Sequence, residues 1–199
     1  MKIIGVGKNY GDNPSQRPSE PIIFTKPDTA ILRKNQDFYF PTFTKEINYE
    51  VEIVVKIDRE GKNITEKFAH KYYQEIGIGI DFTAKDLIEK YKSQGLPWDL
   101  AKGFNGSAPI SEFVNKEEFA SLNNINFHLN INGETKQKCN TKEMFYNIDE
   151  LIVFVSQYYT LKKGDLIFTG TPSGIGPIAI GDRLEAYIEN TKMLDFHVK

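Results

Sequence analysis

Two glutamates separated by a single residue stand at the head of an apolar strand. Residues 48–55 place Glu50 and Glu52 in a β-branched run, which predicts a β-strand. Successive strand side chains point to opposite faces, so the two carboxylates share one face about 7 Å apart, while the intervening valine and isoleucine side chains face a core. Like charges in this arrangement repel, and a divalent cation would convert the repulsion into attraction. An exposed edge strand with two solvated glutamates explains the stretch equally well, so the rest of the chain must decide.

A third carboxylate ends a second strand. Residues 76–81 alternate isoleucine with glycine or aspartate, so Asp81 shares a face with two glycines that leave room for a ligand. If Asp81 converges with Glu50 and Glu52, the site offers only oxygen ligands. Oxygen ligands select a hard cation, which makes Mg²⁺, Mn²⁺ or Ca²⁺ the candidate metal.

Other chemistries have weaker support in the sequence. His70, His128 and His197 lie on separate predicted elements, so a zinc site of clustered His and Cys is not expected. The glycines of residues 170–176 do not match a phosphate-binding fingerprint; they predict either a turn or a row of backbone N–H groups facing an anion. Lys102 is most simply a surface lysine, unless its glycine-rich segment folds over the carboxylates.

The composition excludes several classes of partner. The chain of 199 residues carries 25 basic and 27 acidic residues without a basic block, so nucleic-acid binding has no electrostatic footprint. No apolar run approaches the roughly 20 residues that cross a bilayer, and the apolar N-terminus is too short for a signal peptide, so no membrane partner is expected. Cys139 is the single cysteine, which fits a reducing cytoplasm. We expect a soluble, cytoplasmic protein with one domain over residues 1–199.

The predicted elements indicate an α+β fold with a mainly antiparallel sheet system, because strands outnumber helices and do not alternate regularly with them. Thr83 is expected to cap the second helix, and Asn147 with Glu150 forms a capping-box spacing before the third. Asn132-Gly133 predicts a hairpin turn. The predicted strands are 1–7, 21–26, 48–57, 76–81, 126–131, 134–138, 165–168, 183–189 and 192–198, and the predicted helices are 64–73, 84–94 and 147–159.

Six short motifs in a fixed order resemble one known family. They are Gly7-Lys8-Asn9-Tyr10, Glu20-Pro21 through Lys26-Pro27, Tyr49-Glu50-Val51-Glu52, Asp81-Phe82-Thr83-Ala84-Lys85-Asp86, Gly95-Leu96-Pro97-Trp98 with Ala101-Lys102, and Thr169 to Gly176. Together they resemble the fumarylacetoacetate hydrolase family over almost the whole chain. The closest likeness is to its compact single-domain members, which act as acylpyruvases, oxaloacetate decarboxylases or isomerase/decarboxylases.

The resemblance implies a mixed β-sandwich roll with a few short helices, usually assembled as a homodimer, and a small 2-oxo acid as substrate. By the same carry-over, Mg²⁺ or Mn²⁺ is held by Glu50, Glu52 and Asp81. Lys102 is implied as the catalytic residue in contact with the substrate. The implied substrate-binding residues are Thr171 and Gly170, whose backbone holds the carboxylate, with Tyr10 and with Lys85, which stands where relatives carry arginine.

The loop after Tyr10 departs from the family pattern. Relatives carry a histidine there and a glutamate one helical turn later, on a lid that activates water; this chain has Asn13 at the place of the histidine, in a shortened lid of residues 8–20. Asparagine cannot act as a general base near neutral pH, and loss of such a base lowers the rate of its step by about 10²–10⁴-fold. Decarboxylation or tautomerisation is therefore favoured over hydrolysis, unless Asp12 or another segment supplies the base.

A catalytically silent protein that binds a metal and an oxo acid is the alternative hypothesis. The shortened lid favours this reading. The unbroken set of three carboxylates together with Lys102 favours an enzyme, because a silent relative would have little need to keep them together.

Overall fold

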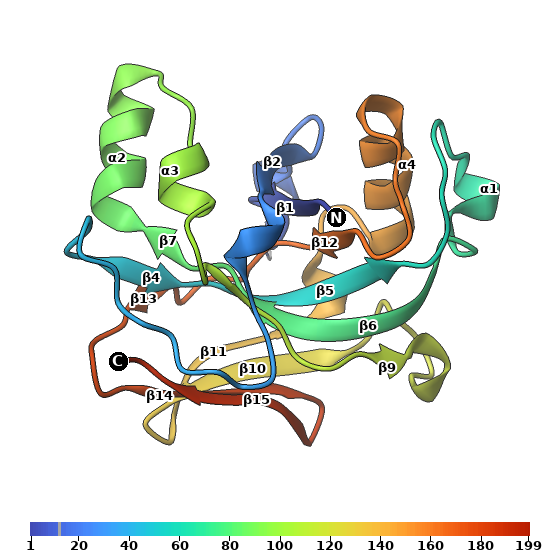
Figure 1. The fold of residues 1–199 in the computed structure, drawn as a ribbon. Helices are drawn as coiled ribbons and strands as arrows, with labels where there is room; N and C mark the ends of the chain where they lie inside the picture. Colours follow the sequence, from blue (N-terminus) through green and yellow to red (C-terminus); the bar gives the residue numbers. More distant parts are fainter. Residues whose placement is uncertain (12) are drawn as a thin grey trace.

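A six-stranded sheet forms the centre of the molecule (Figure 1). The computed structural model describes residues 1–11 and 13–199. The strand order of the six-stranded sheet is β2-β1-β12-β5-β6-β9, in which β1 and β12 are parallel and the other neighbouring pairs are antiparallel. The strands are β1 (Ile3–Gly7), β2 (Ile22–Lys26), β5 (Val51–Ile57), β6 (Tyr73–Ile80), β9 (Val114–Asn115) and β12 (Leu166–Phe168).

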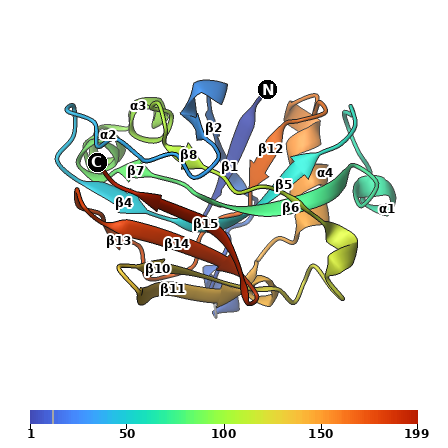
Figure 2. The same cartoon turned by 60° about the horizontal axis from the view of Figure 1, so that its bottom comes forward.

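A second sheet of four antiparallel strands packs below β5 and β6, and its strands lie side by side in Figure 2. The Asn132-Gly133 turn joins two of them, and both residues adopt the positive φ that a tight hairpin turn requires. The core between the sheets includes Ile53, Ile78 and Phe127, all fully buried. The strands are β10 (Asn126–Ile131), β11 (Glu134–Asn140), β14 (Arg183–Ile188) and β15 (Thr191–His197).

The pairing of β5 with β6 continues beyond the main sheet. Val51 pairs with Ile80, and Asn48 of β4 (Ile47–Tyr49) pairs with Thr83 of β7 (Thr83–Ala84), in the same register. Glu50 therefore lies opposite Asp81, whose N–H donates to the Glu50 carbonyl at 2.8 Å. Strand β13 (Gly176–Pro177) pairs with the other edge of β4. This register makes the two carboxylates cross-strand neighbours.

The helices lie above the main sheet, on the side away from the second sheet (Figure 1). Helix α4 begins with the predicted capping box, in which the Asn147 side chain accepts from the Glu150 N–H and the Glu150 carboxylate accepts from the Asn147 N–H. The helices are α1 (Glu66–Ala69), α2 (Lys85–Gln94), α3 (Asp99–Lys102) and α4 (Ile148–Tyr158). Strands β3 (Ile31–Leu32) and β8 (Ala108–Pro109) form a small parallel pair, and four short 3-10 turns, η1 to η4, complete the described elements.

The prediction of an α+β fold with mainly antiparallel strands is confirmed, but two local predictions are wrong. The helix expected over residues 64–73 is the four-residue α1, because Tyr73 pairs with Ile57 at a register shift and belongs to β6. Thr83 does not cap α2: Ala84 holds that position without a side-chain bond, and the Thr83 hydroxyl serves the acidic cluster instead. Among the described helices, none has the length and apolar character needed to cross a bilayer.

Candidate active site

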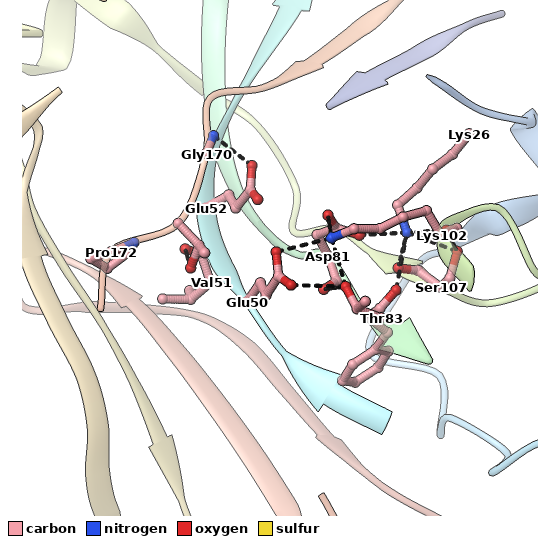
Figure 3. A network of polar contacts seen from close by, with 12 residues as sticks. Lys26, Glu50, Val51, Glu52, Asp81, Thr83, Lys102, Ser107, Gly170 and Pro172 are labelled. Carbon is pink, nitrogen blue, oxygen red and sulfur yellow. Dashed lines mark hydrogen bonds and ion pairs between the residues drawn. The ribbon is translucent and has the colours of Figure 1, made fainter. Parts of the chain in front are cut away.

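Three carboxylates meet on one face of the β4–β5 and β6–β7 ladder (Figure 3). Glu50, Glu52 and Asp81 each offer an oxygen that lies within 4.8 Å of the others. Glu52 and Asp81 are fully buried, whereas the Glu50 side chain keeps 16% of its surface exposed. Val51 and Ile53 point the other way into the core, so the alternation of the strand separates the acidic face from the apolar one.

Lys102, the last residue of α3, reaches into the cluster. Its Nζ lies 2.6 Å from Asp81 Oδ2 and 3.0 Å from Glu50 Oε2, and it donates to the Thr83 hydroxyl at 2.6 Å. Burial opposes the positive charge, but Asp81 and Glu50 outweigh it and raise the pKa of the ammonium. The segment that composition alone assigned to the surface therefore places a buried cation among the carboxylates.

Lys26, the last residue of β2, supplies a second buried cation that the sequence analysis did not identify as a site residue. Its Nζ lies 2.6 Å from Asp81 Oδ1 and also donates to the carbonyls of Phe82, Ser107 and Lys102. Burial lowers its pKa, and the nearby Lys102 acts in the same direction. The contact with Asp81 is an ion pair without hydrogen-bond geometry, which leaves Asp81 Oδ1 as a buried acceptor with no hydrogen-bond donor.

The loop after β12 lies beside Glu52. The Gly170 N–H donates to Glu52 Oε2 at 2.7 Å, and the Thr171 hydroxyl donates to the Val51 carbonyl at 2.9 Å. Gln137, buried on β11, fixes this loop: its Nε2 donates to Thr171 Oγ1 and to the Pro172 carbonyl, and its Oε1 accepts from the Val51 N–H. The loop is thus held beside the carboxylates by a residue that no sequence motif singled out.

The remaining predicted substrate contacts lie outside the carboxylate cluster. The Tyr10 hydroxyl is 3.5 Å from Thr169 Oγ1, its ring packs edge-on against Phe127, and burial raises its pKa. Lys85 begins α2 and pairs with Glu46 at 2.9 Å near solvent. Tyr10 therefore lies against the loop after β12, and Lys85 forms an ion pair with Glu46 rather than with the carboxylate cluster.

Residues 13–18, part of the predicted lid, include contacts with the start of α4. Asn13 is exposed and caps the 3-10 turn η1 (Pro14–Gln16), where its side chain accepts from the Ser15 N–H. The Pro18 carbonyl accepts from the Tyr146 hydroxyl at 2.6 Å, and the Arg17 guanidinium lies 4.2 Å from the centre of the Tyr146 ring. Asp12, the suggested substitute base, lies outside the described residues.

The three histidines lie apart from the cluster. His128 on β10 stacks on Tyr187, and His197 on β15 has Asp37 as its nearest acidic partner at 3.8 Å. His70 follows α1. In the part of the chain that the structure describes, the grouped potential metal ligands are all carboxylates.

The donor set fits a hard divalent cation. Three carboxylates face two lysines, which leaves one negative charge in excess in a buried place. Burial, followed by the charges of Asp81 and Glu50, raises the pKa of Glu52 well above its usual range. Asp81 Oδ1, which is paired with Lys26 but accepts no hydrogen bond, offers a further oxygen ligand. Oxygen-only ligands suit Mg²⁺ and Mn²⁺, and Ca²⁺ as well.

A mixed β-fold with an oxygen-lined acidic centre defines the structural class, and sequence comparison gives the family. The fumarylacetoacetate (FAA) hydrolase C-terminal family matches residues 2–199, and the chain belongs to it. It is 36% identical to the mitochondrial oxaloacetate tautomerase FAHD1 of Bos taurus over 201 residues, which cover 99% of this chain and 91% of that protein. It is 35% identical to the mitochondrial oxaloacetate decarboxylase of Dictyostelium discoideum over 192 residues, which cover 94% and 88%.

Solved structures agree with this membership. Fumarylpyruvate hydrolase from Pseudomonas aeruginosa, in complex with Mn²⁺ and pyruvate, superposes with a TM-score of 0.91 at 28% identity and covers 100% of this chain and 89% of that one. The names of the two curated relatives place them in mitochondria. The cytoplasmic location expected from the sequence stays a prediction.

Proposed function

We propose that the protein is a divalent-metal-dependent enzyme that acts on small 2-oxo acids at the bond next to the keto group. The observation that carries the proposal is the convergence of three buried or half-buried carboxylate side chains within 4.8 Å, with Lys102 among them. Two relatives are named for reactions of oxaloacetate, and a structural neighbour holds Mn²⁺ and pyruvate.

Glu50, Glu52 and Asp81 would hold the metal, with Mg²⁺ or Mn²⁺ as the preferred ion. When bound, the cation supplies Lewis-acid stabilisation of negative charge on the keto oxygen of the substrate. Lys102 contributes a fixed ammonium beside the same place, held by Asp81 and Thr83, so it stabilises the charge without reorganising. The Thr171 backbone, fixed through Gln137, is proposed to hold the substrate carboxylate.

The reaction that this site favours is tautomerisation or decarboxylation of oxaloacetate. In decarboxylation the C–C bond breaks, CO₂ leaves, and the electron pair passes to the enolate oxygen, so an electron sink is the main requirement. Hydrolysis of an acylpyruvate also needs an activated water. Asn13 cannot supply the base, and its side chain already caps a surface turn.

The decisive experiment compares two substrates on the purified protein. With Mg²⁺ or Mn²⁺ present, we expect oxaloacetate turnover above the metal-only background and acetylpyruvate hydrolysis slower by about 10²-fold or more. The control is Glu52→Gln, which keeps the shape of the side chain and removes a carboxylate. Rapid acetylpyruvate hydrolysis would overturn the preference, and absence of turnover with either substrate would overturn the assignment as an enzyme.

A silent binding protein is the second candidate, favoured by the exposed Asn13 in the shortened lid. It predicts that Mg²⁺ and oxalate bind together without turnover of any oxo acid. Calorimetric titration of Mg²⁺ and then oxalate, followed by the turnover assay on the same sample, separates this candidate from the enzyme.

A further inference from the structure

The face that carries Glu52 continues onto neighbouring strands with glycines. Ile3 packs with Val54 and Phe168, and because side chains alternate along a strand, Gly5 and Gly7 of β1 point to this same face. Gly5 pairs with Phe168, which pairs with Val54. Gly7 ends β1, Gly170 lies in the loop after β12, and Glu52 precedes Val54 by two residues on β5. A methyl group added at Gly170 would lie 3.1 Å from the Val6 carbonyl oxygen, so the chain at Gly7 passes close to the Gly170 backbone, whose N–H donates to the Glu52 carboxylate.

The glycines around Glu52 differ in what covers them. A methyl group added at Gly5 would meet the Phe24 ring at 2.2 Å, one at Gly79 would meet Phe168 at 2.7 Å, and one at Gly170 would meet Asn9 at 2.9 Å. At Gly7 the nearest atoms belong to Ile22 at 3.9 Å. Gly7 is half-buried and its φ is not positive, so the position would accept a side chain without backbone strain. Its missing side chain therefore leaves open space rather than room for a neighbour.

The other sides of the carboxylate cluster are filled. Lys102 and Lys26 occupy the Asp81 side, and Phe168 with Val54 fills the face beyond Gly79. In the opposite direction along the strand, the buried Asn48 side chain fills its own position. Glu52 itself is fully buried, and the uncovered position on the neighbouring backbone is Gly7.

Apolar side chains continue from this space along β2. Phe24 covers Gly5, and Lys102 Nζ lies 4.9 Å from the centre of its ring. Ile22 pairs with Gly7. A cavity of about 340 Å³ is lined by Ile22, Phe24 and Lys102, together with Leu96 and Trp98. This cavity borders Gly7 through its strand partner Ile22 and borders the carboxylates through Lys102, and Ile22 and Phe24 make the part nearest Gly7 apolar.

We propose that Gly7 is the floor of the subsite for the substrate tail, the group attached to the keto carbon. This inference rests on the proposed function, because it takes the carboxylate and keto oxygens to lie at the acidic cluster. A tail that packs against the Gly7 backbone can carry no branch at the carbon next to the keto group, because a methyl branch there would clash with that backbone. The subsite selects 2-oxo acids with an unbranched tail, in contact with Ile22 and Phe24.

The test measures binding by calorimetry with Mg²⁺-saturated protein, without any need for turnover. The probes are oxalate, which has no tail, and the series pyruvate, 2-oxobutyrate, 2-oxopentanoate and the branched 3-methyl-2-oxobutyrate. In the wild-type protein we expect the branched acid to bind about 10-fold more weakly than 2-oxopentanoate. In Gly7→Ala we expect oxalate and Mg²⁺ to bind within about twofold of wild type, while the longer unbranched acids lose about 10-fold or more.

Thermal unfolding controls for a general disturbance of β1. Gly7→Ala should have the same unfolding temperature as the wild type. Gly5→Ala, on the same strand face, should have a lower one, because its methyl group would clash with Phe24. Equal binding of all probes to Gly7→Ala and wild type, or an equal loss of oxalate and the tailed acids, would overturn the inference. A wild-type protein that binds Mg²⁺ but none of the probes would instead overturn the proposed function.

Discussion

The two faces of the β5–β6 pair place opposite demands on the same backbone. One face carries Val51, Ile53 and Ile78, fully buried against the second sheet, and gains free energy from apolar burial. The other face holds Glu52 and Asp81 at similar burial, where carboxylates lose hydration and repel one another. The comparison shows that burial alone does not mark a core: one face stabilises the fold, and the other is tolerable only because lysines and N–H groups compensate it.

The largest expected loss of stability comes from removing a buried lysine that balances the charge of the carboxylates. Lys26→Met keeps the approximate side-chain length but removes the ammonium that pairs with Asp81 Oδ1 and donates to three carbonyls, while Lys102 still pairs with Asp81 Oδ2. Breaking a buried ion pair from one side lowers the free energy of unfolding by about 3–5 kcal/mol. Urea unfolding in EDTA measures this loss of stability. The matched control is Lys56→Met, which removes a half-exposed ion pair with Glu75 on the same sheet and should change stability by less than about 1 kcal/mol. Equal stabilities of the two variants would contradict the role of Lys26.

A large-to-small substitution on the apolar face of β5 should lower stability without changing metal binding. Ile53→Ala removes fully buried methyl groups and should lower the free energy of unfolding by about 2–5 kcal/mol. The carboxylates point to the other face, so Mg²⁺ affinity of the folded variant should stay within about twofold of wild type. Calorimetric Mg²⁺ titration beside urea unfolding checks both values; a large loss of Mg²⁺ affinity would show that the two faces are not independent.

The acidic face should also give a pH dependence of definite sign. The folded-state pKa of Glu52 is raised above its ordinary value of 4.5, chiefly by burial and then by Asp81 and Glu50. The folded protein therefore holds this proton more tightly than the unfolded chain, and the Glu52 contribution to stability is lost as the pH rises from about 4.5 through the folded pKa. In EDTA, Glu52→Gln should flatten this part of the stability profile, measured by urea unfolding at several pH values. An unchanged profile would contradict the shift.

The smallest effect is expected where the polar face meets solvent. Lys85 pairs with Glu46 near the surface, with 40% of the lysine side chain exposed. Solvent screens such a pair, so Lys85→Ala should leave urea unfolding unchanged within error. The same variant sharpens the proposed substrate role of Lys85: a raised KM for oxaloacetate with unchanged stability would support it, and unchanged kinetics would refute it.

The alternation of residue types allowed much of the acidic face to be predicted. The two glutamates of β5 and the isoleucine–glycine pattern of β6 each define a face, because strand side chains alternate. Which strands pair, and in which register, is a tertiary property. The sequence therefore suggested that Asp81 could join Glu50, but the direct opposition of the two residues follows only from the pairing of Val51 with Ile80 and of Asn48 with Thr83.

Lys26 and Gln137 could not be identified as site residues from the sequence. A lysine after an apolar strand is ordinarily exposed, and Lys26 is buried only because the carbonyls of Phe82, Lys102 and Ser107 converge on it from a distant segment. The overlong helix prediction over residues 64–73 has a similar cause. Local periodicity favoured a helix, but long-range pairing with β5 takes Tyr73 into a strand.

The Gln137 side chain has a mechanical consequence for the molecule. By bonding to Val51 as well as to Thr171 and Pro172, it fastens the turn after β12 to a hairpin of the other sheet. That turn cannot shift alone; it must move together with β11 or first give up two side-chain hydrogen bonds. The position of the proposed carboxylate-binding backbone is therefore set by Gln137 of the second sheet as well as by Val51 and Glu52 of the acidic strand.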